Sequence, residues 1–419
     1  MNQCARSRSV LQACLRAGKE LSRHPVNGSV WSNSGVLDGQ LYAQGKSTAP
    51  RIAIFQLPVG GRTHYSSASS VPVSADEGKK IDPFTLVQDD LHKISEKMLD
   101  SIKNEVPMLS SAAEYFFRMG VRGKRMRAAV VLLLAETLHV APSASHPTDT
   151  EWIATQHDRQ KGVAAIAEMI HVASLLHDDV LDSSLTRRGV GSVNAVMGNK
   201  MAILGGDFLL ARASVQLAEL ENTKAVWLVA TMLDNLVKGE VLQATMADDS
   251  LLDFDKYLLK SFLKTGSLFA HSAKAVATVG GHSVETCQLA YDYGKSLGLA
   301  FQVIDDMLDF TASSGMLGKP AHNDLKSGLA TAPVLFAAEE FPGLKPLIKR
   351  RFKEPGDVET ASTWVFQSKG IERSFELASQ HAEKAAQAVR EMPMPNTTHG
   401  RRCQQALIEI TQMVLTRKK

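Results

Sequence analysis

The chain has 419 residues, of which 44% are hydrophobic, so it can bury a sizeable core and is long enough for two or three domains. Its four cysteines are scattered without Cys-x-x-Cys spacing, which argues against a disulfide framework or a zinc site and fits a reducing compartment. The net charge of +3 is uneven: residues 1–75 carry eight basic and two acidic residues, so the remainder is close to −3 and offers no basic surface for nucleic acid.

The first 75 residues have the composition of a targeting segment rather than of a fold. They are rich in Arg and Ser, and the apolar Val10, Leu11 and Leu15 alternate with basic residues as on an amphipathic helix. The continuous apolar region of a secretory signal is absent. We therefore predict a mitochondrial transit peptide in residues 1–75, with an ordinary disordered tail as the alternative. Residues 76–419 are then a folded domain in the mitochondrial matrix.

Apolar residues recur at helical spacing from Ile81 to the end of the chain, without a convincing alternating strand pattern or an internal repeat. The pattern predicts one large all-α domain of ten or more helices, with a loop at residues 141–150. Helices that are apolar nearly all round, such as those containing residues 202–204 and 226–230, are expected at its centre. No stretch reaches the ~20 apolar residues needed to span a bilayer. The predicted helices cover residues 84–98, 107–117, 125–139, 161–181, 194–220, 223–246, 255–279, 284–310, 330–340, 358–367, 371–392 and 401–416.

Two runs of identical spacing lie within these helices: Asp178-Asp179-Val180-Leu181-Asp182 and Asp305-Asp306-Met307-Leu308-Asp309. Each places carboxylates at positions i, i+1 and i+4, and residues four apart share a helix face, about 6 Å apart along the axis. Because unpartnered carboxylates are costly to bury, a cation is expected between them. Oxygen ligands without a nearby His or Cys cluster favour Mg²⁺, which also takes oxygens from bound phosphate. One run alone could be a solvated helix face, but two copies indicate a divalent-metal site for a diphosphate.

Basic residues beside the motifs could bind the diphosphate itself. Arg187 and Arg188 follow the first motif closely, and a guanidinium suits bidentate contact with phosphate oxygens. Lys124 and Arg127 lie at a predicted helix start, which also favours an anion, although such a run taken alone is more often solvated. His171 lies two turns before the first motif on the same face. A lone histidine there is usually a core residue, but the neighbouring charges favour substrate contact.

Several of these runs together resemble those of a trans-isoprenyl diphosphate synthase, over residues 85–417; they are Leu175–Asp182, Thr186–Gly189, Gly205–Ala211, Phe301–Asp309 and Gly318–Pro320. The resemblance implies a single helical bundle of the isoprenoid synthase type around a deep central cavity, with the two aspartate motifs facing each other across its mouth. It implies an Mg²⁺-dependent prenyltransferase that joins isopentenyl diphosphate to an allylic diphosphate, farnesyl or geranylgeranyl. Within the family the chain is most similar to mitochondrial long-chain enzymes, so nona- or decaprenyl diphosphate for the ubiquinone side chain is the expected product.

The resemblance also assigns catalytic and binding roles by position. It gives Mg²⁺ to Asp178, Asp182 and Asp305, and supporting catalytic roles to Asp179, Asp306 and Asp309. Isopentenyl diphosphate is expected to bind Lys124, Arg127, His171 and Arg188. The allylic diphosphate is expected to bind Arg187, Lys264, Thr265, Gln302 and Lys319.

The chain departs from the family pattern at two positions. Ala128 stands where a proline is usual, which should matter little. Leu329 stands where a lysine is frequent, so binding of the allylic diphosphate is expected to depend more on Arg187, Lys264 and Lys319.

Product length is expected to depend on Ala173 and Ser174, about one turn before the first motif. We expect them to face down the cavity, and both are small where short-chain family members tend to carry aromatic residues. A small floor would let the product grow beyond farnesyl length.

Other interpretations compete with this one. A terpene cyclase uses the same fold, but its second metal motif is typically a mixture of Asn, Ser and Glu, whereas this chain repeats the aspartates. A non-catalytic partner subunit would have degraded aspartates, and both sets are intact. The sequence leaves open whether the chain forms a homodimer or requires a second, non-identical synthase subunit, and whether it touches a membrane peripherally.

Overall fold

The computed structural model describes residues 82–103, 107, 111, 114–115, 125–139, 150–187, 189–311 and 322–417. These residues belong to one compact unit, Ala75–Lys419. The predicted transit segment at residues 1–75 lies outside the described residues, and so do three predicted site residues, Lys124, Arg188 and Lys319. The roles of these residues therefore stay predictions.

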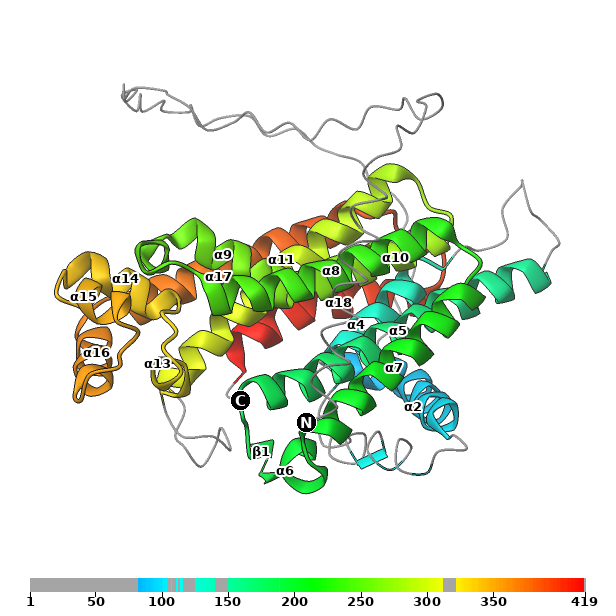
Figure 1. Ribbon diagram of the computed structural model, residues 1–419. Coiled ribbons are helices and arrows are strands. Elements are labelled where there is room, and N and C mark those ends of the chain that lie inside the picture. Colours follow the sequence, from blue (N-terminus) through cyan, green and yellow to red (C-terminus); the bar gives the residue numbers. More distant parts are fainter. Residues whose placement is uncertain are drawn as a thin grey trace, which may run out of the picture. The chain divides into compact units, whose positions relative to one another are not determined.

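The described part of the chain is almost entirely helical, which confirms the predicted all-α class (Figure 1). The helices are α2 (Gln88–Ile102), α4 (Met126–Thr137), α5 (Thr150–Leu181), α6 (Val193–Met197), α7 (Asn199–Glu219), α8 (Thr223–Thr245), α9 (Phe254–Ser261), α10 (Ser267–Val279), α11 (Val284–Thr311), α13 (Asn323–Lys326), α14 (Ala332–Glu340), α15 (Leu344–Lys349), α16 (Asp357–Gln367), α17 (Gly370–Glu391) and α18 (Thr398–Thr416). The shorter elements are the 3₁₀ turns η1 (Pro83–Val87) and η2 (Asp248–Leu252), the π-turn η3 (Phe262–Gly266), and the strands β1 (Thr186–Arg187) and β2 (Val190–Gly191).

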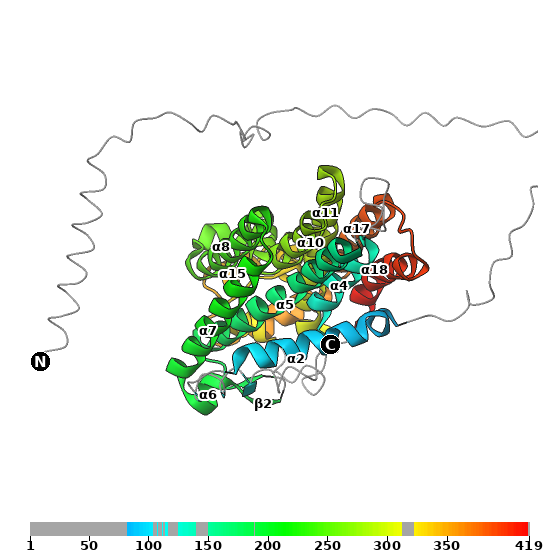
Figure 2. The same ribbon diagram turned by 90° about the vertical axis from the view of Figure 1, so that its right-hand side faces the viewer.

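Helices α4, α5 and α10 form the inside of the bundle, with α2, α7, α8, α11, α17 and α18 around them (Figure 2). Helix α4 is buried without a break from Ala128 to Ala135, because its sequence is apolar on every side. Helix α11 packs closely on η3 and α10 through glycines. A Cβ atom added at Gly294 would lie 2.4 Å from the carbonyl oxygen of Phe269, and one at Gly298 would lie 2.6 Å from the Cα of Gly266. This close contact fixes α11 against the segment that carries Lys264 and Thr265.

Helices α7 and α8 lie at the surface of the described unit, where the sequence predicted central helices. On α7, Ile203 is 43% and Val215 is 53% exposed; on α8, Trp227 is 65% and Val237 is 63% exposed. Helix α7 is also the one described helix that is long and apolar enough to cross a membrane, by length and composition alone, although no such stretch was expected. The same composition is typical of helices that pack in a bundle, and α7 packs along α5.

Three local features differ from the prediction. Helix α5 begins at Thr150, well before residue 161, so it continues directly from the end of the predicted loop. Strands β1 and β2 form a short antiparallel hairpin, with Gly189 at a φ of +81° in its turn, where no strand was predicted. Strands of two residues are too short to show an alternating pattern. The predicted helix at residues 255–279 is continuous but takes π geometry at η3.

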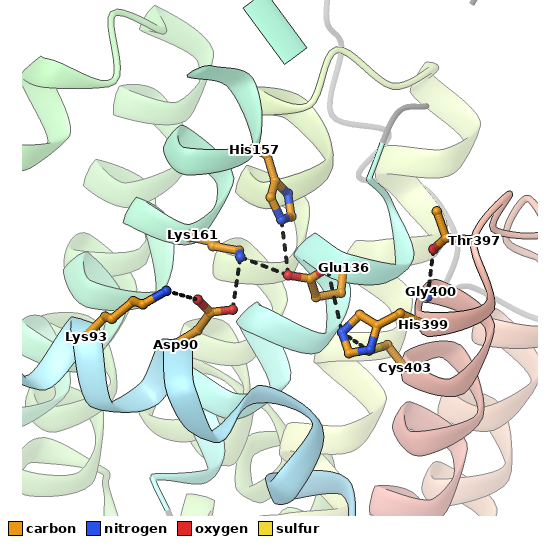
Figure 3. A network of polar contacts seen from close by, with 9 residues as sticks. All are labelled: Asp90, Lys93, Glu136, His157, Lys161, Thr397, His399, Gly400 and Cys403. Carbon is orange, nitrogen blue, oxygen red and sulfur yellow. Dashed lines mark hydrogen bonds and ion pairs between the residues drawn. The ribbon is translucent and has the colours of Figure 1, made fainter. Parts of the chain in front are cut away.

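A partly buried ionic network joins α2, α4, α5 and α18 at the C-terminal end of α4 (Figure 3). The carboxylate of Glu136 lies 3.1 Å from His157 and 2.9 Å from Lys161, and Lys161 also lies 2.9 Å from Asp90. His399 of α18 lies 3.8 Å from Glu136. Burial alone would raise the pKa of Glu136, but hydrogen bonds from His157 and Lys161 lower it from 4.5 to about 2. The network therefore holds an ionised carboxylate inside the bundle.

Replacing Glu136 by Gln is expected to lower the melting temperature by roughly 5 °C at neutral pH, because Lys161 and His157 would lose a partly buried ionised partner. Since folding lowers the pKa of Glu136, its contribution to stability is full above its ordinary pKa of 4.5 and is lost as the pH falls towards 2. The difference between wild type and Glu136→Gln should therefore shrink between about pH 5 and pH 3 in thermal unfolding. A difference that does not change with pH would contradict the ionic role of Glu136.

Candidate active site

The two aspartate motifs, at the end of α5 and in α11, both border the segment formed by α9 and η3. The charge of Lys264 on η3 acts on Asp178 and Asp182 of the first motif. Tyr257 on α9 and Thr265 on η3 belong to a hydrogen-bonded chain that ends on Asp306 of the second motif. The fold therefore brings the motifs, 127 positions apart from Asp178 to Asp305, to one site.

Asp178 is a partly buried carboxylate that has no hydrogen-bonded side-chain partner among the described residues. Burial raises its pKa to about 6; Lys264 and Arg187 oppose this rise, whereas Glu240 and Asp182 add to it. Lys264 itself lies 2.7 Å from Glu240. A desolvated carboxylate of this kind favours the binding of a further cation.

Asp179, unlike Asp178, has its carboxylate hydrogen-bonded to another side chain of the protein. It is 2% exposed, and Arg187 donates two hydrogen bonds to it, Nε to Oδ2 and Nη2 to Oδ1, each 2.8 Å long. The amide of Asn194 donates to the backbone oxygens of Asp179 (3.1 Å) and Ser184 (3.0 Å), which folds the hairpin back against the helix end. The bidentate pair leaves the Nη1 edge of Arg187 as the side that could contact a phosphate.

Asp306 is buried in the second motif and is oriented by two neighbours. Tyr257 donates to its Oδ2 at 2.6 Å, and the amide of Gln302 donates to its Oδ1 at 2.8 Å. Thr265 donates in turn to the Oε1 of Gln302 at 2.6 Å. Burial raises the pKa of Asp306 to about 6, which Lys260 opposes. Thr265 and Gln302, predicted to bind the allylic diphosphate, thus position Asp306 in this structure.

The outer aspartates of the second motif differ in their partners. Asp309 accepts hydrogen bonds from the backbone N–H groups of Asn323 and Asp324, both at 3.0 Å, and so holds the start of α13. Asp305 forms an ion pair with Arg417, at the end of α18. Asp305 is therefore bound by a side chain rather than by the backbone, and its own side chain is 59% exposed.

Arg127 and His171, both predicted to bind isopentenyl diphosphate, lie together. Nη1 of Arg127 is 3.2 Å from Nε2 of His171. The Arg127 guanidinium also lies over two aromatic rings, 4.9 Å from the centroid of Phe269 and 5.6 Å from that of Phe301. Arg417 lies over Phe301 as well, at 4.0 Å. Phe301 therefore links the predicted isopentenyl side of the site to the residue that pairs with Asp305.

The two residues predicted to control product length lie inside the fold. Ala173 is fully buried in the core, and Ser174 is partly buried. The hydroxyl of Ser174 donates to the backbone oxygen of His171 at 2.9 Å, within its own helix. Because this hydroxyl is hydrogen-bonded within its own helix, it needs no further partner from the residues around it.

Four residues of the site were not found from the sequence: Glu240, Tyr257, Lys260 and Arg417. Lys260 could have been found, since it lies four residues before Lys264 and shares its helical face. Arg417 carries no local signal, because it is 112 residues from the Asp305 that it contacts.

An all-α bundle with two aspartate motifs around one cationic segment defines the isoprenoid synthase class of enzymes. Comparison with known proteins identifies the group within it. Residues 106–365, more than half of the chain, match the family model described as polyprenyl synthetase. The chain therefore belongs to the polyprenyl synthetase family and is a prenyltransferase.

Relatives of known name and solved structures agree with this assignment. The chain is 47% identical to the chloroplastic/mitochondrial solanesyl diphosphate synthase 3 of Arabidopsis thaliana, over 86% of this chain and 85% of that protein. It is 39% identical to a human all-trans-polyprenyl-diphosphate synthase, over 85% and 82% of the two chains. Among solved structures, it is similar to the apo form of an Arabidopsis medium/long-chain length prenyl pyrophosphate synthase, with 42% identity and a TM-score of 0.65 over 81% of this chain and all of that one. A polyprenyl synthase from Caulobacter crescentus, solved with calcium and isoprenyl diphosphate, is 30% identical, with a TM-score of 0.69 over 81% and 98%.

Proposed function

We propose that this prenyltransferase elongates an allylic diphosphate with successive isopentenyl diphosphate units and releases a long-chain all-trans polyprenyl diphosphate for the ubiquinone side chain. The relatives support the long-chain part of this proposal, since they are named solanesyl, decaprenyl and hexaprenyl diphosphate synthases. Long-chain synthesis, predicted from the sequence, is thereby confirmed. Nona- or decaprenyl length remains the proposed refinement.

The aspartates separate into those that could hold Mg²⁺ and those that shape the site. Asp179, Asp306 and Asp309 are bound by Arg187, by Tyr257 with Gln302, and by the start of α13. The remaining three, Asp178, Asp182 and Asp305, are the proposed Mg²⁺ ligands. Asp305 pairs with Arg417 through an exposed side chain, so Mg²⁺ would take the place of that ion pair. Within the described residues no three His, Cys, Asp or Glu side chains already converge as a metal cluster. Carboxylate oxygens alone nevertheless suit Mg²⁺, which binds through one or two carboxylates together with waters and phosphate oxygens.

Ionisation of the allylic diphosphate is the step that the site is proposed to accelerate. Bound Mg²⁺ would neutralise the diphosphate as it leaves. Lys264 lies beside Asp178 and would hold the same group from the other side. Arg127 and His171 would orient isopentenyl diphosphate so that its double bond attacks the allylic carbon, whose bond to oxygen breaks. A proton is then lost from the new carbocation, with the departed diphosphate as the proposed acceptor. The apolar interior excludes water, which would otherwise quench the cation.

Incorporation of labelled isopentenyl diphosphate tests the proposed reaction. The full chain is incubated with farnesyl diphosphate and Mg²⁺, with and without a chelator. Chelator-sensitive formation of acid-labile allylic products supports the proposal. Release of cyclic hydrocarbons in place of elongated diphosphates would instead support a terpene cyclase.

The exposed apolar residues of α7 and α8 are the proposed contact with a second synthase-type subunit. Ile203, Val215, Trp227, Val237 and Val241 are each 43–65% exposed on these two helices. Exposed large apolar side chains on surface helices are typical of a protein–protein interface. The mass of the chain expressed alone separates the two cases: a dimer indicates identical subunits, and a monomer that becomes active only with a co-expressed synthase-like protein indicates a non-identical one.

The protein is proposed to work in the mitochondrial matrix, since several relatives are named as mitochondrial and residues 1–75 have the composition of a transit peptide. Its long apolar product suggests peripheral contact with a membrane at release.

Replacing Ala173 by Phe is expected to shorten the products. The residue is buried five positions before Asp178, and a phenyl group there would fill space below the proposed metal site. Ser174→Ala is the comparison variant and should leave product length unchanged, because position 174 stays small and the lost hydroxyl is bonded only within its own helix. Overpacking can cost about 1–3 kcal/mol, so the melting temperature is measured alongside. An unchanged product spectrum from folded Ala173→Phe would show that this position does not limit length.

A further inference from the structure

The segment formed by α9 and η3 presents two lysines, each acting on a different aspartate motif. Lys264 acts on Asp178 and Asp182 of the first motif. Lys260, four residues earlier, acts on Asp306 of the second motif and on the partly buried Asp324. One short segment therefore supplies a cation to each side of the site.

Lys260 is placed beside the second motif by Tyr257. Its ammonium lies 5.4 Å from the centroid of the Tyr257 ring, and the hydroxyl of Tyr257 donates to Asp306 at 2.6 Å. Asp306 is 3% exposed, and the backbone N–H of Asp324 is bonded to Asp309 of the same motif at 3.0 Å, so negative charge is already concentrated on this side of the site. A diphosphate entering here would add negative charge to these carboxylates, so a positive group is needed on this side.

Lys260 also lines a pocket together with Leu329. The pocket is an open hollow at the surface, and Asp253 also lines it. Its other walls include Gln243 of α8, one turn beyond the Glu240 that pairs with Lys264. The pocket therefore continues the site along α8, from Lys264 towards Lys260. Leu329 gives this pocket no charge. The positive charge among its lining residues is that of Lys260, on α9.

We propose that Lys260 binds the diphosphate of the allylic substrate at the second-motif end of the site, and thereby supplies the positive charge that residue 329 lacks. This assignment rests on the proposed prenyl transfer. Lys264 and Lys260 then hold the diphosphate from the two ends of one segment, with Lys264 beside Asp178 of the first motif and Lys260 beside Asp306 of the second. Binding of isopentenyl diphosphate, on the Arg127 side, does not involve Lys260.

Binding of inorganic pyrophosphate in the presence of Mg²⁺, measured by calorimetry on the full chain, tests the proposal without turnover. Lys260→Met keeps the length of the side chain and removes its charge, and should weaken binding about tenfold or more, since a charge-assisted hydrogen bond is lost. Lys260→Arg should bind nearly as wild type. Lys256→Met is the matched control, because Lys256 lies one turn earlier and is bonded to Ser250 at 2.6 Å. Wild-type affinity in a folded Lys260→Met protein would overturn the proposal.

Moving the positive charge from position 260 to position 329 gives a second, independent test of the proposal. Leu329→Lys added to Lys260→Met should recover most of the lost affinity, because the two side chains line the same pocket. Failure to recover would contradict the assignment of residues 260 and 329 to one cationic position. The KM for the allylic substrate should rise in Lys260→Met while that for isopentenyl diphosphate stays unchanged. If the wild type binds pyrophosphate through Lys260 but incorporates no isopentenyl diphosphate, the proposed function fails and the role of Lys260 stands.

Discussion

Asp178→Asn is expected to reduce kcat/KM for isopentenyl incorporation by about a thousandfold, a loss of roughly 4 kcal/mol of transition-state stabilisation. Asp178 is partly buried, has no hydrogen-bonded side-chain partner among the described residues, and lies where Lys264 and Asp182 meet. Asn has the same shape but provides a neutral, weaker ligand for Mg²⁺. Steady-state kinetics over a range of Mg²⁺ concentrations measures the effect, and higher Mg²⁺ should recover part of it.

The control for this change is a surface aspartate with a single ion pair. Asp249 is 89% exposed at its side chain and pairs with Lys349 at 2.6 Å. Asp249→Asn should leave kcat/KM unchanged. Activity of Asp178→Asn within tenfold of the wild type would mean that Asp178 is not a metal ligand.

Arg187→Met is expected to destabilise the fold by about 3 kcal/mol as well as lower activity, because it leaves the carboxylate of Asp179 buried without its partner. Asp179 is 2% exposed, so water cannot replace the two lost hydrogen bonds. Lysine cannot form the bidentate pair, so Arg187→Lys should recover only part of the stability. Chemical denaturation, followed by circular dichroism, measures the change.

A double variant separates the two roles of Arg187. If the cost comes from the unpaired carboxylate, Asp179→Asn combined with Arg187→Met should be more stable than Arg187→Met alone. Activity should stay low in both, because the guanidinium is absent. An Arg187→Met protein as stable as the wild type would contradict the structural role of the pair.

The positions of both motifs and the helical class were predictable because they depend on local spacing. Carboxylates four apart on an apolar helix specify a shared face whatever the tertiary fold. Which aspartates are hydrogen-bonded within the protein, and which are left to bind Mg²⁺, was not predictable in this way. It depends on Tyr257 and on Arg417, which lie 49 and 112 residues from the aspartates that they contact. Thr265 and Gln302 could be assigned to the site, but their hydrogen bond to each other follows only from the packing of α11 on η3.

The surface position of α7 and α8 shows a second limit of sequence patterns. Apolar residues on every side of a helix predict burial, but not whether the covering surface belongs to the same chain. Trp227, 65% exposed on α8, satisfies the same pattern as the fully buried Leu132 on α4. The start of α5 at Thr150 was missed for a different reason, because residues 154–162 contain no large apolar residue and so give no helical pattern of apolar positions.

The length distribution of the products tests the central claim most directly. The full chain, alone and co-expressed with a synthase-like second subunit, is incubated with farnesyl diphosphate, Mg²⁺ and labelled isopentenyl diphosphate, and the dephosphorylated products are separated by length. Two intact aspartate motifs and a small residue at position 173 predict all-trans products of long-chain length in at least one of the two preparations. Products that stop at farnesyl or geranylgeranyl length, or no incorporation in either preparation, would contradict the account.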